Sequence, residues 1–174
     1  MKKILTRILA VMLIGCILCV AFAACEMSTT TTTAEPEGDK EQSGGDVSSV
    51  TGNNVFVVTY KKTAAGKVTA TVYVAGTVKL AGFSGSLKYD GAVLDCASVS
   101  KSESTMYLND STDGEISFSC AGTGDITKTT ELFKVEFTYS GSVNTLLDLS
   151  VNEASDASLN DVTFSCQDIT VAVD

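Results

Sequence analysis

One stretch of the chain decides the fold: Leu80-Ala81-Gly82-Phe83-Ser84-Gly85-Ser86-Leu87-Lys88-Tyr89-Asp90-Gly91-Ala92-Val93-Leu94-Asp95-Cys96-Ala97-Ser98-Val99. In its first half, every second residue from Phe83 to Tyr89 is apolar or glycine, and the residues between them are polar. This period of two predicts a strand with one buried face. Asp90-Gly91 then predicts a tight turn, because glycine tolerates the positive φ that many turns need. Since Val93-Leu94 opens a second apolar run, the stretch predicts a β-hairpin in an all-β domain.

Short strands are predicted on both sides of this hairpin. The clearest is Lys67 to Ala75, where small apolar residues alternate with Thr and Tyr. The others are Val55 to Tyr60, Thr105 to Leu108, Glu115 to Ala121, Leu132 to Tyr139, Thr145 to Val151 and Val162 to Val173. About nine short strands without any stretch of helical period predict an antiparallel β-sandwich or jelly roll. Their two-faced alternation excludes a parallel α/β sheet.

Residues 1–24 have the layout of a secretion signal. Lys2, Lys3 and Arg7 form a basic start, and residues 8–24 are almost wholly apolar with small residues at the end. A retained membrane anchor is the alternative, because the run has about the minimum length of a spanning helix. We expect residues 1–24 to be a lipoprotein-type signal peptide.

A cysteine follows the small residues that end this signal. Phe22-Ala23-Ala24-Cys25 resembles the bacterial lipobox, in which such a cysteine receives lipid and becomes the new N-terminus. Leu13-Ile14-Gly15-Cys16 fits that box better in its letters, but it would leave a very short apolar run before it. Cys25 is therefore the predicted lipidation site, with Cys16 or a plain secretory cut after Ala23 as alternatives. The expected location is the extracellular face of the cell membrane, lipid-anchored after export.

Composition changes abruptly after the signal. Residues 25–53 hold five consecutive threonines, Thr29 to Thr33, and then acids and Ser43-Gly44-Gly45, without apolar periodicity. We predict a disordered tether with an r.m.s. span of about 30 Å. The folded domain is then predicted at residues 54–174, a length that buries roughly two thirds of the unfolded surface without cross-links.

The residue types give no support for catalysis. The chain has no histidine and no tryptophan, and its only arginine, Arg7, lies in the signal. The domain therefore lacks the usual general base near neutral pH and the commonest metal ligand. Two carboxylates alone can hydrolyse some substrates, but the acids here lie mostly in predicted turns beside Gly, Ser or Asn. We expect neither an enzyme nor a cofactor.

Metal and disulfide patterns are equally weak. The run Asn109-Asp110-Ser111-Thr112-Asp113-Gly114 starts like a calcium loop, but Cys120 stands where that loop needs a bidentate acid. We therefore predict a hairpin turn and no metal site. Cys96, Cys120 and Cys166 remain in the domain. The sequence leaves open whether two of them form a disulfide, since export permits one and no spacing requires it.

The charge of the chain restricts its partners. The mature chain keeps all 21 acidic residues and 9 of the 12 basic ones, because Lys2, Lys3 and Arg7 leave with the signal. Its net charge is then near −12. Such a charge favours solubility and argues against nucleic acid or an anionic bilayer surface as a partner.

The order of these landmarks resembles the cohesin domain, the receptor module of cellulosome assemblies. That family carries a gly/ala-phe-x-x-x-leu-x-tyr-asp strand followed by a val-leu run, as residues 81–90 and Val93-Leu94 do here. A gly-x-ile-x-phe strand, a leu/phe-x-val/ile-x-phe strand and a closing alternation follow. Their counterparts are Gly114 to Phe118, Leu132 to Phe137 and Ile169 to Val173. The resemblance implies a nine-stranded jelly roll related to some carbohydrate-binding modules.

The resemblance also implies a partner and a surface. Cohesins bind dockerins, small calcium-loaded helical domains fused to polysaccharide-degrading enzymes. The contact would use outward residues of three strands, here Ser84, Ser86, Lys88, Tyr107, Ser117 and Ser119. Several cohesins carry Asn and Asp on the central strand, where this chain has Gly82 and Ser84. Our leading hypothesis is a membrane-tethered module that holds a dockerin-bearing or other exported protein at the cell surface.

Two other functions stay open at this level. The first is a carbohydrate-binding module on the same fold, for which Tyr73 and Tyr107 are the candidate exposed rings. Two outward Tyr residues on one sheet would favour that hypothesis. The second is a structural interaction domain of the cell envelope.

Overall fold

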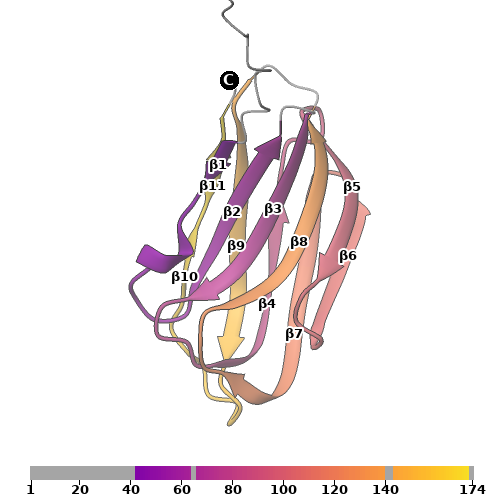
Figure 1. The fold of residues 1–174 in the computed structure, drawn as a ribbon. Coiled ribbons are helices and arrows are strands. Elements are labelled where there is room, and N and C mark those ends of the chain that lie inside the picture. The colour runs from indigo at the N-terminus through magenta and orange to yellow at the C-terminus, as the bar shows by residue number, and fades with distance from the viewer. Residues whose placement is uncertain (1–41, 64–65, 140–142, 173–174) are drawn as a thin grey trace, which may run out of the picture. The chain divides into compact units, whose positions relative to one another are not determined.

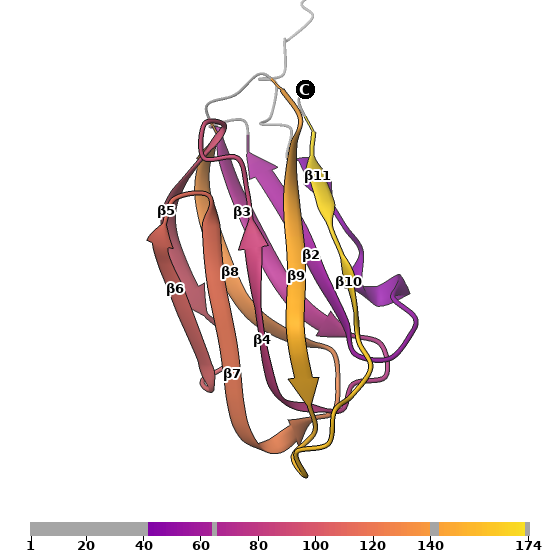
Figure 2. The same ribbon diagram turned by 180° about the vertical axis from the view of Figure 1, so that it is seen from behind.

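The computed structural model describes residues 42–63, 66–139 and 143–172. Two sheets lie face to face, as both ribbon views show (Figures 1 and 2). The six-stranded sheet has the order β1-β2-β3-β8-β5, with β10 added to β2, and the five-stranded sheet has the order β11-β9-β4-β7-β6. Every pairing is antiparallel except that of β10 with β2. The predicted β-sandwich is confirmed.

The elements follow the predicted strands closely. In chain order they are β1 (Gln42–Gly44), the 3-10 helix η1 (Val47–Ser49), β2 (Val55–Thr63), β3 (Lys67–Ala75), β4 (Leu80–Lys88), β5 (Leu94–Lys101), β6 (Met106–Thr112), β7 (Glu115–Ile126), β8 (Thr130–Tyr139), β9 (Thr145–Ser155), β10 (Ser165–Gln167) and β11 (Ile169–Val171). The final predicted strand, residues 162–173, is in fact two strands. Its chain leaves the first sheet after Gln167 and enters the second at Ile169.

The predicted hairpin at Asp90-Gly91 is wrong. β4 pairs with β7 and β9, whereas β5 pairs with β8 in the other sheet, so the turn carries the chain between sheets. Gly91 does not have a positive φ. Its lack of a side chain makes room for Asp113, because a Cβ at Gly91 would lie 2.6 Å from a carboxylate oxygen of Asp113. The run Asn109–Gly114 does contain a hairpin turn, as predicted: it connects β6 to β7, and Gly114 has a φ of 80.

Residues 42–53 differ from the predicted tether. β1 pairs with β2, and Val47 and Val50 pack against Val55 and Val57 on the outer face of the six-stranded sheet. The sequence Gln42–Gly44 has no apolar alternation, and its pairing with β2 is formed by the backbone. The folded domain therefore starts by Gln42 rather than at residue 54. Residues 25–41 of the predicted tether, and the signal, lie outside the described residues.

Aromatic rings join the two sheets in the core. The ring of Phe56 on β2 lies 5.1 Å from Phe83 on β4, and Phe118 on β7 lies 5.2 Å from Phe133 on β8. Fully burying such side chains is worth about 1.5–3 kcal/mol each. Cys96, Cys120 and Cys166 are all free thiols, so no disulfide links the described residues.

Gly85 allows the close approach of β9 to β4, which leads to the first prediction. A Cβ there would overlap Ser150 O and lie 2.7 Å from Phe118 Cζ. We expect Gly85→Ala to destabilise the domain by about 1–3 kcal/mol, because the backbone of β9 and the ring of Phe118 must move to admit one methyl group. The midpoint of urea unfolding measures this loss.

Gly124→Ala is the matched control for Gly85→Ala. Gly124 also lies in a strand of the five-stranded sheet, and nothing lies within 4 Å of the position a Cβ would take. We expect its effect to stay within about 0.5 kcal/mol. Equal stability losses in the two variants would contradict the assignment of the loss to crowding at Gly85.

Candidate functional site

The outward side chains of β9, β4, β7 and β6 form three rows across the five-stranded sheet. Each outward residue of β4 lies between one residue of β9 and one residue of β7. That residue of β7 in turn lies beside a residue of β6. In the order β9, β4, β7, β6 the rows are Glu153, Ser84, Ser119, Tyr107; then Ser150, Ser86, Ser117, Asn109; then Asp148, Lys88, Glu115, Thr112. We call these residues the serine face.

The side chains at the centre of the serine face are short, and several of them form hydrogen bonds with their neighbours. Ser84 Oγ donates to Glu153 Oε1 at 3.0 Å, and the hydroxyls of Ser86 and Ser150 share a hydrogen bond of 3.2 Å. Ser86 is only 8% exposed. Small side chains with satisfied hydroxyls leave a surface that a partner can approach closely without losing hydrogen bonds to water.

Tyr107 projects from the sheet beside these short side chains. Its side chain is 70% exposed. It lines two hollows, one on each side of the first row: one of about 390 Å³ toward Ser117 and Asn109, and one of about 510 Å³ toward Leu159. The face is therefore not flat, because an aromatic ring projects between two depressions.

Two further features extend the serine face, and neither was predicted from the sequence. A β-bulge at Asn152 leaves both Asn152 and Glu153 exposed, so β9 presents two consecutive polar residues outward. Leu159, in the loop between β9 and β10, is 86% exposed and borders the same hollow as Tyr107. A single leucine in a polar loop belongs to no periodic pattern, so sequence analysis could not identify it.

A buried carboxylate fixes this loop. Asp156 is 4% exposed and accepts hydrogen bonds from Lys79 Nζ at 2.9 Å and from the backbone N–H groups of Ser158 and Asn160. The hydrogen bond from Lys79, followed by those from Asn160, holds the pKa of Asp156 well below its usual 3.8. Leu159 has a φ of 63, a backbone conformation that this network enforces.

A family model for the cohesin domain matches residues 54–172. This chain belongs to the cohesin domain family. Three strands of the serine face, β4, β6 and β7, are those through which the sequence resemblance implies a contact. No curated protein sequence matches the chain.

Solved structures agree with this assignment at the level of the fold. The chain is similar to a cohesin in the Coh-OlpA–Doc918 complex, a type I cohesin–dockerin complex from Clostridium thermocellum, with 12% identity and a TM-score of 0.60 over 68% of this chain and 96% of that one. It is also similar to the cohesin of the Coh-OlpC–Doc435 complex from the same organism, with 18% identity and a TM-score of 0.57 over 68% of this chain and 92% of that one. A non-cellulosomal cohesin from Archaeoglobus fulgidus has 17% identity to this chain and a TM-score of 0.57, over 68% of this chain and 89% of that one.

All six predicted contact residues of this cohesin module lie on the serine face: Ser84, Ser86 and Lys88 on β4, Tyr107 on β6, and Ser117 and Ser119 on β7. That they bind a partner stays a prediction. The two candidate sugar-binding rings do not meet, because Tyr73 lies on β3 of the opposite sheet. The pair of outward Tyr residues on one sheet is therefore not found.

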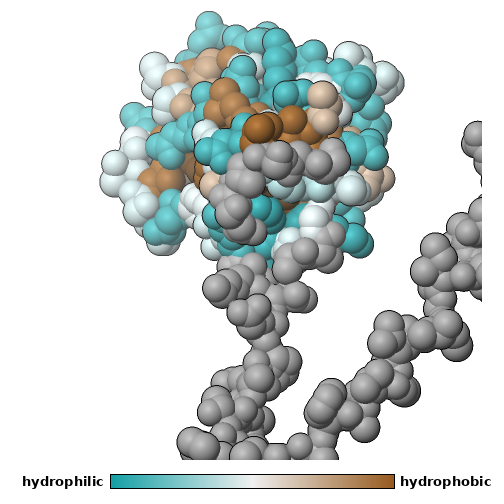
Figure 3. All heavy atoms as spheres, turned by 90° about the horizontal axis from the view of Figure 1, so that it is seen from above, coloured by the Kyte–Doolittle hydropathy of each residue, from teal (hydrophilic) through white to brown (hydrophobic). Residues whose placement is uncertain are grey.

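Exposed apolar side chains among the described residues lie mainly at the ends of the sandwich. Besides Tyr107 and Leu159, they include Val143 and Leu146, at the end where β9 begins. Figure 3 shows that end, with apolar atoms in brown beside hydrophilic ones in teal. Within the described ranges, no helix is long and apolar enough to cross a membrane, and no three acidic or cysteine side chains gather as a metal site.

The second prediction concerns the pH dependence of the Asp156 network. Because the pKa of Asp156 is lower in the folded state than its usual 3.8, its ionised form stabilises the fold above that pH. This contribution is lost as the pH falls through the folded-state pKa. Asp156→Asn should lower the urea midpoint at pH 7, and the gap to wild type should shrink below about pH 4.

Asp148→Asn provides the control for this experiment. Asp148 is an exposed acid on β9, the strand that precedes the loop of Asp156, and we expect its substitution to change the midpoint little at any pH. An unchanged midpoint of Asp156→Asn at pH 7 would show that the network does not stabilise the loop.

Proposed function

We propose that this cohesin module is non-catalytic and binds a dockerin-bearing exported protein through the serine face. A lipid at Cys25 would tether it, and the assembly would serve polysaccharide degradation at the cell surface. The family membership supports the proposal, and so do two similar structures that were solved as cohesin–dockerin complexes.

One observation carries the proposal: Tyr107 is exposed between two hollows, beside the serines at the centre of the face. Interface energy concentrates in a few large anchors, of which Tyr is among the commonest, surrounded by residues that mainly exclude water. Leu159 adds an apolar side chain at the border of the same hollow. Serines around the two anchors allow a helical partner to lie close to the sheet.

The charges on the serine face restrict the partner further. Glu153, Asp148 and Glu115 contribute three carboxylates, against one ammonium group from Lys88. A partner with basic side chains around its contact surface complements this pattern, and complementary charge mainly raises the association rate.

The third prediction tests the face. The full chain, immobilised, is incubated with the exported proteins of the source organism, with calcium and then with a chelator. We expect calcium-dependent retention of a protein that carries a dockerin, identified by mass spectrometry. Tyr107→Ala should weaken its binding by about 30-fold, the effect of losing an anchor worth about 2 kcal/mol.

Two further variants make this test specific. Ser117→Arg places bulk on the exposed centre of the face and should also weaken the complex, whereas Tyr73→Ala, on the opposite sheet, should not. Absence of a dockerin among the retained proteins, or equal retention by Tyr107→Ala, would rule out the proposed interface.

The fourth prediction tests the tether. Cys25 lies outside the described residues, and its lipidation rests on the sequence alone. In a bacterial host fed a radiolabelled fatty acid, we expect label in the wild type and in Cys16→Ser, and none in Cys25→Ser. Label that persists in Cys25→Ser and disappears in Cys16→Ser would move the lipid to Cys16.

A further inference from the structure

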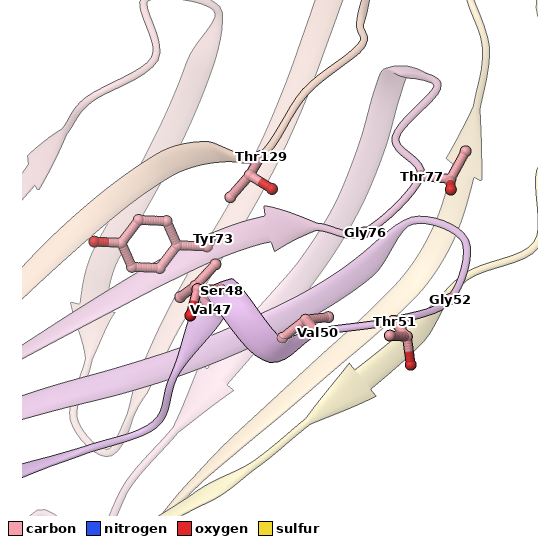
Figure 4. Close-up of a pocket in the computed structure, with 9 residues that line it drawn as sticks. All are labelled: Val47, Ser48, Val50, Thr51, Gly52, Tyr73, Gly76, Thr77 and Thr129. Carbon is pink, nitrogen blue, oxygen red and sulfur yellow. The ribbon is translucent and has the colours of Figure 1, made fainter.

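A third hollow lies on the other side of the sandwich, under η1. It has a volume of about 680 Å³, which falls within the range of small-molecule sites. Three segments line it: residues 47–52, the end of β3 with the turn after it, and Thr129 before β8 (Figure 4). In Figure 4, Tyr73 and Thr129 lie toward one end of the hollow, and Thr77 and Thr51 toward the other.

The segment that covers this hollow is held by specific contacts. Asp46 caps η1 by accepting a hydrogen bond from Ser48 N at 2.9 Å. Val47 and Val50 pack on the apolar patch of Val55, Val57 and Ala75. The backbone N–H of Thr77 donates to Gly52 O at 2.9 Å, which closes the far end. These contacts fix the segment that covers the hollow, so little ordering of that segment is needed on binding.

The lining differs in charge from the rest of this acidic chain. All nine lining residues are uncharged, and five of them carry hydroxyl groups: Ser48, Thr51, Tyr73, Thr77 and Thr129. The remaining residues are two valines and two glycines. A phosphorylated or carboxylated ligand would find no Lys or Arg in this lining to pair with its charge.

The ring of Tyr73 is held in a fixed position. Its hydroxyl donates to Glu131 Oε2 at 3.3 Å, and Glu131 itself accepts from Ser102 and pairs with Lys134 Nζ at 3.0 Å. These contacts orient the ring without adding a charged group to the lining. An amphipathic ring fixed in this way presents an apolar surface beside polar groups.

We propose that this hollow, the Tyr73 pocket, binds the end of a neutral oligosaccharide. A neutral sugar has apolar C–H surfaces, which can pack on the aromatic ring of Tyr73 and the two valines. It also has many hydroxyls, which can form hydrogen bonds with the hydroxyl side chains of the lining. The Tyr73 pocket lies on the outer face of the six-stranded sheet, opposite the serine face. The module would thus bind a glycan and a protein at the same time.

The fifth prediction tests the Tyr73 pocket on the full chain with cellohexaose, xylohexaose and, as a charged probe, hexagalacturonate. We expect calorimetry to detect saturable binding of at least one neutral probe, with a Kd below about 1 mM. Tyr73→Ala and Thr129→Arg should each weaken it at least tenfold. Because Thr129 is exposed, we expect Thr129→Arg to fold normally. It therefore tests the pocket even if Tyr73→Ala fails to fold.

Tyr107→Ala serves as the control, because it removes the exposed ring of the serine face and should leave sugar binding unchanged. Failure of both neutral probes to bind saturably would overturn the proposal, as would tighter binding of hexagalacturonate. Loss of binding in Tyr107→Ala but not in Tyr73→Ala would assign the sugar to the serine face. None of these outcomes depends on whether a dockerin binds.

Discussion

The pairing of β4 with both β7 and β9 is the constraint on which the sandwich depends. A strand hydrogen-bonded on both edges has only its two faces free, and here one face enters the core while the other forms the middle of the serine face. Gly85 lets β9 come close enough to complete the pairing, and the bulge of β9 at Asn152 lies next to this point of close approach. The shape of the candidate interface is therefore determined by the same backbone contacts that determine the core.

The period of two in the sequence predicted which side chains are buried, because burial follows the alternation of each strand. Phe83, Leu87, Ile116 and Phe118 are all in the core, as expected. The same pattern says nothing about which strands are neighbours. This is why the Asp90-Gly91 turn was assigned to a hairpin, although it connects the two sheets.

Features without a side-chain pattern escaped sequence analysis. β1 contributes backbone hydrogen bonds from Gln42–Gly44, a segment that reads as a linker. Leu159 is positioned by the hydrogen bonds of Asp156, which join groups distant in the chain. By contrast, the six predicted contact residues share a face because they occupy alternate positions on strands that pair in register.

The three free thiols give this domain an independence from its redox surroundings. Burial raises the pKa of Cys96, Cys120 and Cys166 above its ordinary value. Since the thiolate is the form that reacts, a raised pKa lowers the fraction of each thiol that is in the reactive form. No disulfide joins the described residues, so none has to form for the two sheets to pack against each other.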